Sequence, residues 1–216
     1  MISGRPFQVP GDPHDWPRDM NTLPAACAVL VIDMQHDYCS PGYYLDKAGF
    51  DTRRLSKPIE PIRNLLNVAR RRGIQVIYTR HGRLPSNPAE ESPPSSFPKV
   101  ALAGRPGWQI VPELSPVPED IIVAKSTCGA FVSGKLHRIL RNKAIRHLAF
   151  CGNTIDVCVH STLRAAVDLG YECLLLSDCC AAVNDGLHTW AIESVKIEYG
   201  VFGTVSDSSA FIKALS

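Results

Sequence analysis

One cysteine stands where an apolar run gives way to an amphipathic pattern. Cys158 follows the apolar run 147–150 and begins the helical pattern 158–170. A thiol at the start of a helix lies near the positive end of the helix dipole and near unpaired backbone N–H groups, which favour the thiolate. The same N–H groups can stabilise an oxyanion on an attacked carbonyl. A free cysteine is also commonly a buried apolar side chain, so the position of Cys158 leaves a nucleophile and a structural thiol both open.

The other cysteines of the apolar runs have no such position. They lie inside strand-like segments or beside them, and we predict buried structural thiols for Cys27, Cys151, Cys173, Cys179 and Cys180. The chain has eight cysteines, without the spacing of a small disulfide scaffold and without a CxxC pair or closely spaced histidines. We therefore expect free thiols in a reducing compartment, and no zinc site.

An acid and a lysine end two other apolar runs. Asp33 closes the run that starts at Cys27, and Lys125 closes the run 121–124. Taken singly, Asp33 could be an ion-pair partner or a turn cap, and Lys125 a solvated lysine. With Cys158 they supply a proton shuttle, an electrostatic partner and a nucleophile, which suit covalent catalysis at a carbonyl. The histidines offer no better base, because we expect surface positions on helices or turns for His36, His137, His147, His160 and His188.

Strand-like and helix-like segments alternate along nearly the whole chain. Continuous apolar runs predict strands buried on both faces, over residues 27–35, 74–80, 120–125, 145–152, 171–178 and 201–206. Helical spacing predicts helices over 58–73, 129–144, 158–170, 185–200 and 207–215. This order predicts a three-layer α/β/α fold around a mostly parallel sheet. Ligands of such sheets bind beyond the carboxyl ends of the strands, where we place Asp33, His81, Lys125, residues 152–158 and Asp178.

The size and charge of the chain limit its partners. With 216 residues, 45% of them hydrophobic, and a formal net charge of +2, it predicts one domain over 1–216 and gives no reason to expect nucleic acid or an anionic membrane. We predict a polar N-terminal extension over 1–22, without signal-peptide character, and an irregular excursion over 85–118, which holds about half of the 17 prolines. No apolar run reaches the ~18 residues of a membrane span, so we expect a cytoplasmic protein.

Four stretches of the sequence together resemble the isochorismatase-like cysteine hydrolases. They are VLVIDMQHDYCSPGYYLD, VAKSTCGAF, CGNTIDVCVHSTLRAAVDLGYECLLLSDCCAA and VFGTVSDSSAF, and the resemblance extends from about Asn21 to the C-terminus. Within the family the sequence is most similar to the biuret hydrolase and ureidoacrylate amidohydrolase branch. The resemblance implies the isochorismatase-like hydrolase fold, a small-molecule substrate, no cofactor, and a homo-oligomer, either a dimer or a tetramer.

The resemblance also implies a role for individual residues. A catalytic triad falls on Asp33, Lys125 and Cys158, and the oxyanion hole on the backbone N–H groups of Thr154 and Cys158, with a cis peptide before Thr154. Positions that line the pocket in the ureidoacrylate branch fall on Tyr38, Tyr44, His81 and Cys128. The two tyrosines could instead only cover the loop after the first strand, and Cys128 could only pack. The metal-binding branch of the family uses an acid and two histidines, and His81 has no neighbouring histidine in the sequence, so we predict no metal.

These implications give a leading hypothesis and two alternatives. The leading one is a metal-independent cysteine amidohydrolase that cleaves a C–N bond, other than a peptide bond, of a small ureido or carbamoyl compound through a thioester-type intermediate. The alternatives are a related hydrolase of an isochorismate-like or nicotinamide-like substrate, and a catalytically silent scaffold of the same fold. Three positions depart from the family pattern. Ile155 in place of a threonine and Asn153 in place of an aliphatic residue could alter the loop that carries the oxyanion hole, and a shorter segment over 85–108 leaves the substrate open. Ile155 and the shorter segment are the support for the silent scaffold.

Overall fold

Six parallel strands form the central sheet of the computed structural model, which describes residues 5–82 and 104–216. The strands are β1 (Cys27–Ile32), β2 (Gln75–His81), β3 (Ile121–Lys125), β4 (His147–Asn153), β5 (Glu172–Ala181) and β6 (Thr204–Ser206). Their order across the sheet is β3-β2-β1-β4-β5-β6. The order reverses direction between β1 and β4, which makes this pair the topological switch point. The predicted strands are confirmed, with small differences in their ends.

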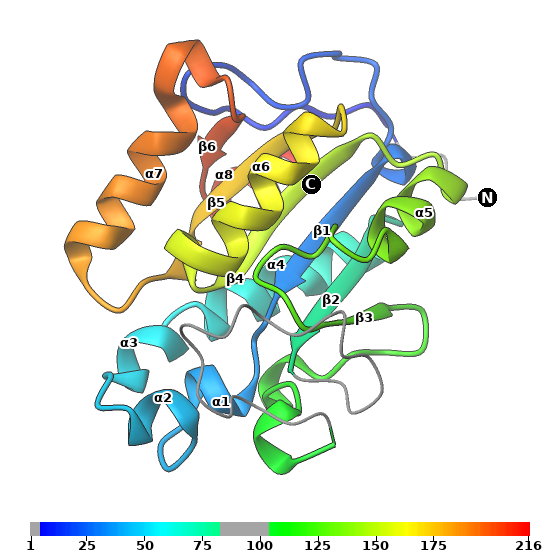
Figure 1. Cartoon of the computed structure of the whole chain (residues 1–216). Helices are drawn as coiled ribbons and strands as arrows, with labels where there is room; N and C mark the ends of the chain where they lie inside the picture. The colour runs from blue at the N-terminus through cyan, green and yellow to red at the C-terminus, as the bar shows by residue number, and fades with distance from the viewer. Residues whose placement is uncertain (1–4, 83–103) are drawn as a thin grey trace.

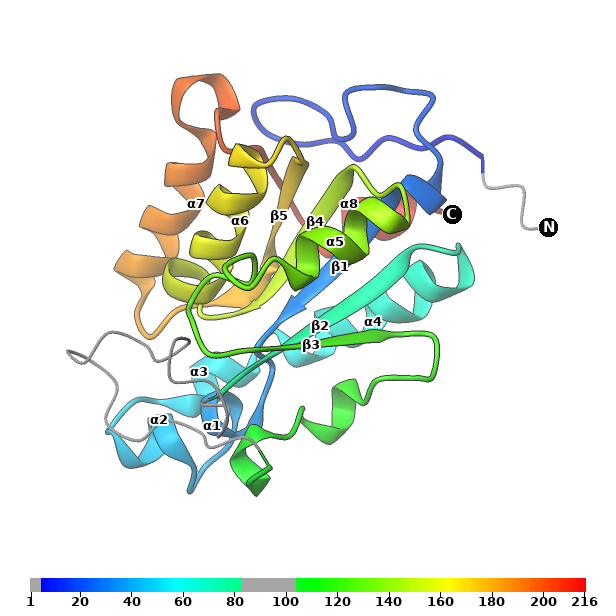
Figure 2. The ribbon, with the colours of Figure 1, turned by 45° about the vertical axis from the view of Figure 1, so that its right-hand side comes forward.

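Helices cover both faces of the sheet, so the predicted three-layer α/β/α fold is confirmed (Figures 1 and 2). Neighbouring strand residues point to opposite faces, and in β1 the side chains of Val29 and Val31 belong to one core while those of Leu30 and Ile32 belong to the other. The first core contains residues of α4 (Ile59–Arg71) and α8 (Ser208–Ala214). The second contains residues of α5 (Lys135–Asn142), α6 (His160–Asp168) and α7 (Asp185–Gly200).

Two of the predicted helices are shorter in the structure. The helix predicted over 129–144 begins only at Lys135, because Gly134 adopts a left-handed conformation with φ 70°. In α7 the backbone leaves helical geometry at Ile197, Glu198 and Tyr199. Both differences lie at helix ends, where sequence periodicity gives little information.

Three short helices after β1 were not predicted from the sequence. They are α1 (His36–Cys39), α2 (Tyr44–Lys47) and α3 (Thr52–Ser56). Each has only one turn or slightly more, too short for an apolar periodicity. They gather beyond the carboxyl ends of the strands (Figure 1). They therefore form one wall of the region where a ligand of a parallel sheet binds.

The excursion predicted over 85–118 lies partly outside the described residues, which resume at Gly104. From there to residue 118 the backbone contains two 3₁₀ turns, η3 (Pro106–Trp108) and η4 (Pro112–Leu114), in otherwise irregular chain. Proline begins each turn, as its fixed φ and missing N–H favour. None of the helices in the described parts of the chain combines the length and the hydropathy that a bilayer crossing needs.

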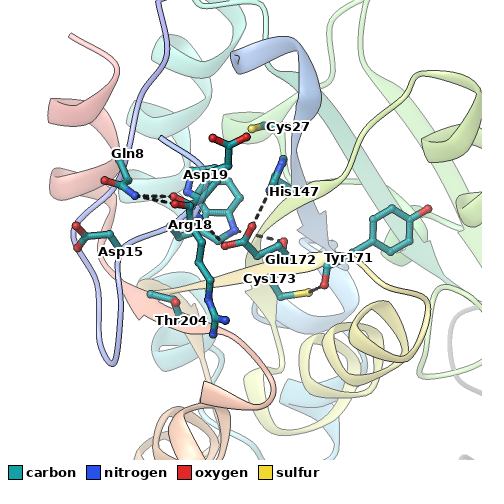
Figure 3. A network of polar contacts seen from close by, with 12 residues as sticks. Gln8, Asp15, Arg18, Asp19, Cys27, His147, Tyr171, Glu172, Cys173 and Thr204 are labelled. Atoms are coloured by element: carbon teal, nitrogen blue, oxygen red, sulfur yellow. Dashed lines mark hydrogen bonds and ion pairs between the residues drawn. The ribbon is translucent and has the colours of Figure 1, made fainter. Parts of the chain in front are cut away.

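The N-terminal segment packs against the amino-terminal ends of β4 and β5 (Figure 3). Trp16 is fully buried, stacks on Phe211 with ring centroids 6.1 Å apart, and donates from its indole nitrogen to the backbone oxygen of Glu172 at 3.3 Å. The carboxylate of Glu172 accepts from the backbone of Arg18 at 2.8 Å and pairs with Nδ1 of His147 at 3.0 Å. These contacts hold the segment at the end of the sheet opposite α1, α2 and α3.

Candidate active site

The switch point between β1 and β4 brings two distant parts of the chain together. Asp33 follows β1, and the segment from Thr154 to Cys158 follows β4. Gly152 makes the close approach possible: its φ is +117°, and a Cβ at this position would lie 2.1 Å from the backbone oxygen of Ile32. Asp33 itself has φ 49°, which turns the chain sharply out of the strand. The sequence therefore places a carboxylate and a thiol on either side of the same crevice.

A buried ion pair joins Asp33 and Lys125. Lys125 Nζ lies 2.6 Å from Asp33 Oδ2, and the two side chains are only 3% and 1% exposed. The hydroxyl of Thr79 donates to the other carboxylate oxygen, Oδ1, at 2.6 Å. Lys125 also donates to the backbone oxygens of Thr127 and Cys128, both at 3.0 Å. Charged groups this deep in a protein are retained only when paired, and these contacts fix both in one orientation.

The sequence suggested that Cys158 is the first residue of a helix, but it lies inside a widened helical turn. The turn η5 (Ile155–Val159) is π-helical, and the backbone N–H of Val159 donates to the oxygen of Thr154 at 3.2 Å. The peptide bond between Asn153 and Thr154 is cis, which confirms the conformation that the resemblance implied. The hydroxyl of Thr162, one turn further on, donates to the backbone oxygen of Cys158 at 2.7 Å. Single π-turns inside helices occur frequently at functional sites.

The two departures from the family pattern each have a place in this loop. Ile155 is fully buried in the core with α6 and α7, so it anchors the start of the turn. The side-chain nitrogen of Asn153 donates to the backbone oxygen of Leu55 at 2.7 Å and to the sulfur of Cys39 at 3.3 Å. Asn153 therefore ties the loop before the cysteine to α1 and α3.

The protonation of Cys128, Cys158 and Lys125 is linked, because each of these groups shifts the pKa of another. The pKa of the Cys128 thiol is lowered to about 6, because Cys158 hydrogen-bonds to it and because Lys125 stabilises its thiolate. The same hydrogen bond, together with burial, raises the pKa of Cys158 well above its usual value, although Lys125 acts in the opposite direction. Burial disfavours a charge on Lys125, but Asp33 and Cys158 outweigh it and raise the lysine pKa. The resting site therefore holds Cys158 as a thiol, whereas the helix-start position had suggested a thiolate.

His81 and Tyr38 form a neutral pair beside the cysteine. Tyr38 Oη lies 2.5 Å from His81 Nδ1, and the rings stack. Burial and the charge of Lys125 lower the pKa of His81, so the imidazole is neutral at pH 7. Burial and the neighbouring Asp33 and Cys158 raise the pKa of Tyr38. The side chain of Gln35 holds the backbone of His81 from both sides, through its amide oxygen at 2.7 Å and its amide nitrogen at 3.0 Å.

A cavity of about 320 Å³ opens onto the Cys158 thiol. The four residues expected to contact a substrate, Tyr38, Tyr44, His81 and Cys128, all line it. Its other walls come from α2, the turn η5 and the segment after β5, and include Leu45, Phe50, Thr154, Asp156, Val157 and Val183. The volume and the mixture of apolar walls with a few polar groups are typical of a site for a small molecule.

Three potential metal ligands lie close together at the base of the cavity. A carboxylate oxygen of Asp33, a ring nitrogen of His81 and the sulfur of Cys158 are within 4.8 Å of one another. The ammonium group of Lys125 already pairs with Asp33 and hydrogen-bonds to Cys158. A divalent cation held by these three atoms would face that positive charge at short range, so the residues as arranged do not fit a metal.

Two groups of residues from the sequence prediction lie elsewhere. Asp178 is not at a strand end, because β5 continues to Ala181, and its carboxylate accepts from the backbone and hydroxyl of Ser208. His160 is buried, and its Nε2 contacts the backbone oxygen of Ala191 at 3.1 Å, so a surface position was wrong for this histidine. The expectation of buried structural thiols is confirmed for Cys27, Cys151, Cys173, Cys179 and Cys180.

Sequence reasoning missed two residues of the site. Thr79 is a polar side chain in the apolar strand β2, two positions before His81 and on the same face, and this pattern could have identified it. Asp156 stands two positions before Cys158 and lines the cavity. Only the turn geometry shows that its side chain reaches the same space.

Comparisons with known proteins show the family of the chain and agree with its fold. The isochorismatase domain model matches residues 27–210. The ureidoacrylate amidohydrolase RutB of Caulobacter segnis is 34% identical over 225 residues, with 96% of this chain and 90% of that protein covered. RutB of Stutzerimonas stutzeri is 37% identical over 191 residues, with 80% and 75% covered.

Solved structures show the same fold. A cysteine hydrolase from Pseudomonas syringae pv. phaseolicola superimposes with a TM-score of 0.77 at 24% identity, covering 90% of this chain and 94% of that one. N-carbamoylsarcosine amidase from Thermoplasma acidophilum superimposes with a TM-score of 0.66 at 23% identity, covering 84% and 96%. With the domain match over most of its length and relatives above 30% identity, the chain belongs to the isochorismatase family.

Proposed function

We propose that this protein is a cysteine-dependent amidohydrolase that cleaves a C–N bond of a small ureido or carbamoyl compound. The observation that supports it most is the position of the Asp33–Lys125 ion pair next to a thiol that opens onto a small-molecule cavity. The names of the relatives, ureidoacrylate amidohydrolases, point to the same class of bond. The carbonyl of a ureido group would lie over Cys158 at the base of the cavity.

The first step forms a bond between sulfur and carbon. Cys158 Sγ attacks the carbonyl carbon while its proton passes to the carboxylate of Asp33, which lies within 4.8 Å of the sulfur. Because the resting cysteine is a thiol, a nearby base is required, and Asp33 is the acceptor that the geometry offers. Lys125 remains an ammonium group, which stabilises the developing charge and keeps Asp33 oriented.

The second step breaks the C–N bond and the third restores the enzyme. Asp33 returns the proton to the leaving nitrogen, which departs as ammonia or an amine, and the carbamoyl group stays on Cys158 as a thioester-type intermediate, an S-carbamoyl cysteine. A water molecule then attacks this carbonyl and gives one proton to Asp33, which passes it to the departing sulfur, so that a carbamic acid is released and both Cys158 and Asp33 return to their starting forms. The backbone N–H groups of Thr154 and Cys158 serve as the oxyanion hole in both additions.

Turnover of a substrate panel tests the proposal. Wild-type protein is incubated with ureido and carbamoyl compounds, and the release of ammonia and of amine is measured together. We expect Cys158→Ala to abolish release and to remove the acylated peptide that mass spectrometry detects in quenched wild-type reactions. Cys27→Ala is the matched control, since Cys27 is buried at the opposite end of β1 and should leave turnover unchanged. Undiminished turnover in Cys158→Ala would reject the proposal, and an inert wild-type protein would favour the scaffold alternative.

A further inference from the structure

Asp156 is an acidic side chain of the cavity that the proposed mechanism does not use. It stands two residues before Cys158 in the turn η5 and borders the same cavity. Residues two positions apart do not share a helix face, so the two side chains approach the cavity from different sides. Asp156 therefore faces a part of the substrate other than the carbonyl that Cys158 attacks.

Asp156 is a half-buried residue, and one of its two carboxylate oxygens has no hydrogen-bond partner among the described residues. Its Oδ1 is buried and accepts no hydrogen bond from the described residues, and none of the ion pairs in that part of the chain includes it. The cavity wall around it includes the apolar side chains of Leu45, Phe50 and Val157. A buried carboxylate oxygen without a donor is costly, and a ligand that brings N–H groups to it would recover that cost.

The charges of the described cavity wall favour a positive ligand group. No lysine or arginine is among its described residues, and Lys125 beneath it is already paired with Asp33. The imidazole of His81 is neutral and the phenol of Tyr38 stays protonated, because their pKa values move away from neutrality. Among the described residues of the wall, no cation therefore balances the charge of Asp156. A substrate with a carboxylate at its far end would meet a like charge here.

We propose that Asp156 selects substrates whose far end carries an ammonium group, so that the ureido compound cleaved at Cys158 is the carbamoyl derivative of an amine with a second basic nitrogen. This inference rests on the proposed function and narrows its substrate class. It separates the protein from its relatives named for ureidoacrylate, whose far end is a carboxylate. Asp156 would bind the ammonium group through a charged hydrogen bond while Cys158 attacks the ureido carbonyl.

Three linear ureido compounds of equal chain length test the inference. Their far ends carry an ammonium, a carboxamide or a carboxylate group, and kcat/KM is measured for each. We expect the wild-type protein to favour them in that order. Asp156→Asn should reduce the ratio of kcat/KM between the ammonium and the carboxylate compounds by about 10- to 100-fold, the size expected for one lost hydrogen bond between charged groups. Asp156→Lys should invert the preference.

A matched control separates substrate recognition from the general effect of neutralising an acidic side chain in a helical turn. Glu60 is an exposed acid in the first turn of α4 and does not border the cavity. Glu60→Gln should leave the ratio unchanged. A wild-type preference for the carboxylate compound, or a ratio that Asp156→Asn does not alter, would overturn the inference while the proposed hydrolysis could stand.

Binding to the Cys158→Ala variant tests the inference without catalysis. Calorimetry should show tighter binding of the ammonium compound than of the carboxylate compound, and Asp156→Asn should remove the difference. Equal binding, or no binding of any of the three, would overturn the inference. Selective binding of the ammonium compound combined with an inert wild-type protein would overturn the proposed function alone.

Discussion

Removing the ammonium group of Lys125 should destabilise the protein strongly, and in a way that depends on Asp33. The variant Lys125→Met keeps most of the volume of the side chain but leaves the Asp33 carboxylate, 1% exposed, without its partner 2.6 Å away. At an effective dielectric constant of about 20, the attraction lost at that distance is about 6 kcal/mol. Part of it is regained because Lys125 no longer has to be desolvated, so we expect a net loss of about 3–5 kcal/mol in the free energy of unfolding.

Two further variants show whether the unpaired charge is the cause. Asp33→Asn combined with Lys125→Met removes both charges, and we expect it to be more stable than Lys125→Met alone by about 2 kcal/mol or more. Lys196→Met is the control for losing a lysine: its partners Asp12 and Glu193 are 67% and 62% exposed, so we expect a loss of about 1 kcal/mol or less.

Urea denaturation, followed by circular dichroism, measures the wild-type protein and the three variants. The slope of each transition is compared first, because a changed slope means that the unfolding reaction itself has changed. A loss below about 1 kcal/mol in Lys125→Met would refute the assignment of a structural ion pair. A double variant no more stable than Lys125→Met would refute the role of the unpaired charge.

Three other properties of the site and its scaffold can be checked in the same way. Cys128→Ser should remove the thiolate that appears in ultraviolet absorbance near pH 6, whereas Cys39→Ser, whose thiol pKa burial raises to about 12, should not. Gly152→Ala should lower the free energy of unfolding by about 3 kcal/mol or more, because its Cβ would lie 2.1 Å from the backbone oxygen of Ile32. Gly170→Ala is the control: its φ is +83° and no atom lies within 4 Å of the added Cβ, so the free energy of unfolding should fall by only about 1–2 kcal/mol. Glu172→Gln should lower the free energy of unfolding by about 0.5–1.5 kcal/mol at pH 7, as measured by urea denaturation. Contacts with His147 and Arg18 outweigh burial and lower the pKa of the Glu172 carboxyl, so this contribution is present above the unfolded-state value and disappears as the pH falls through the folded-state value; an equal loss at pH 7 and at strongly acidic pH would contradict it.

The strands and their polar ends could be predicted because burial leaves a direct trace in the sequence. A parallel sheet covered on both faces requires continuous apolar runs, and β1 and β4 show them. The residue that ends such a run must lie at the carboxyl edge of the sheet, which is why Asp33 and Lys125 could be placed near each other before any coordinates. The structure brings them into contact with Cys158, and their catalytic roles remain a prediction.

The protonation states of the site residues could not be predicted from the sequence, because they depend on distances between residues far apart in the chain. The sequence shows Cys158 at the start of a helix, which favours a thiolate. It does not show that Cys128, thirty positions earlier in the chain, hydrogen-bonds to the same sulfur. Nor does it show that Asp156 lines the cavity with one carboxylate oxygen unpaired among the described residues, because the backbone of the π-helical turn sets the direction of that side chain.

The arrangement of the charges explains how Cys158, the proposed nucleophile, can stay protonated until a carbonyl compound enters the cavity. Lys125 lies between Asp33 and the two thiols, so the ammonium group can balance only part of their negative charge at once. With Asp33 ionised and the Cys128 thiolate present, a second thiolate at Cys158 would add an uncompensated charge to a buried space. Attack on a carbonyl avoids this cost, because the charge that leaves sulfur moves to the carbonyl oxygen while the proton moves to Asp33. On this reasoning, a reagent with a polarised carbonyl should react with Cys158 much faster than an alkylating agent that requires a free thiolate.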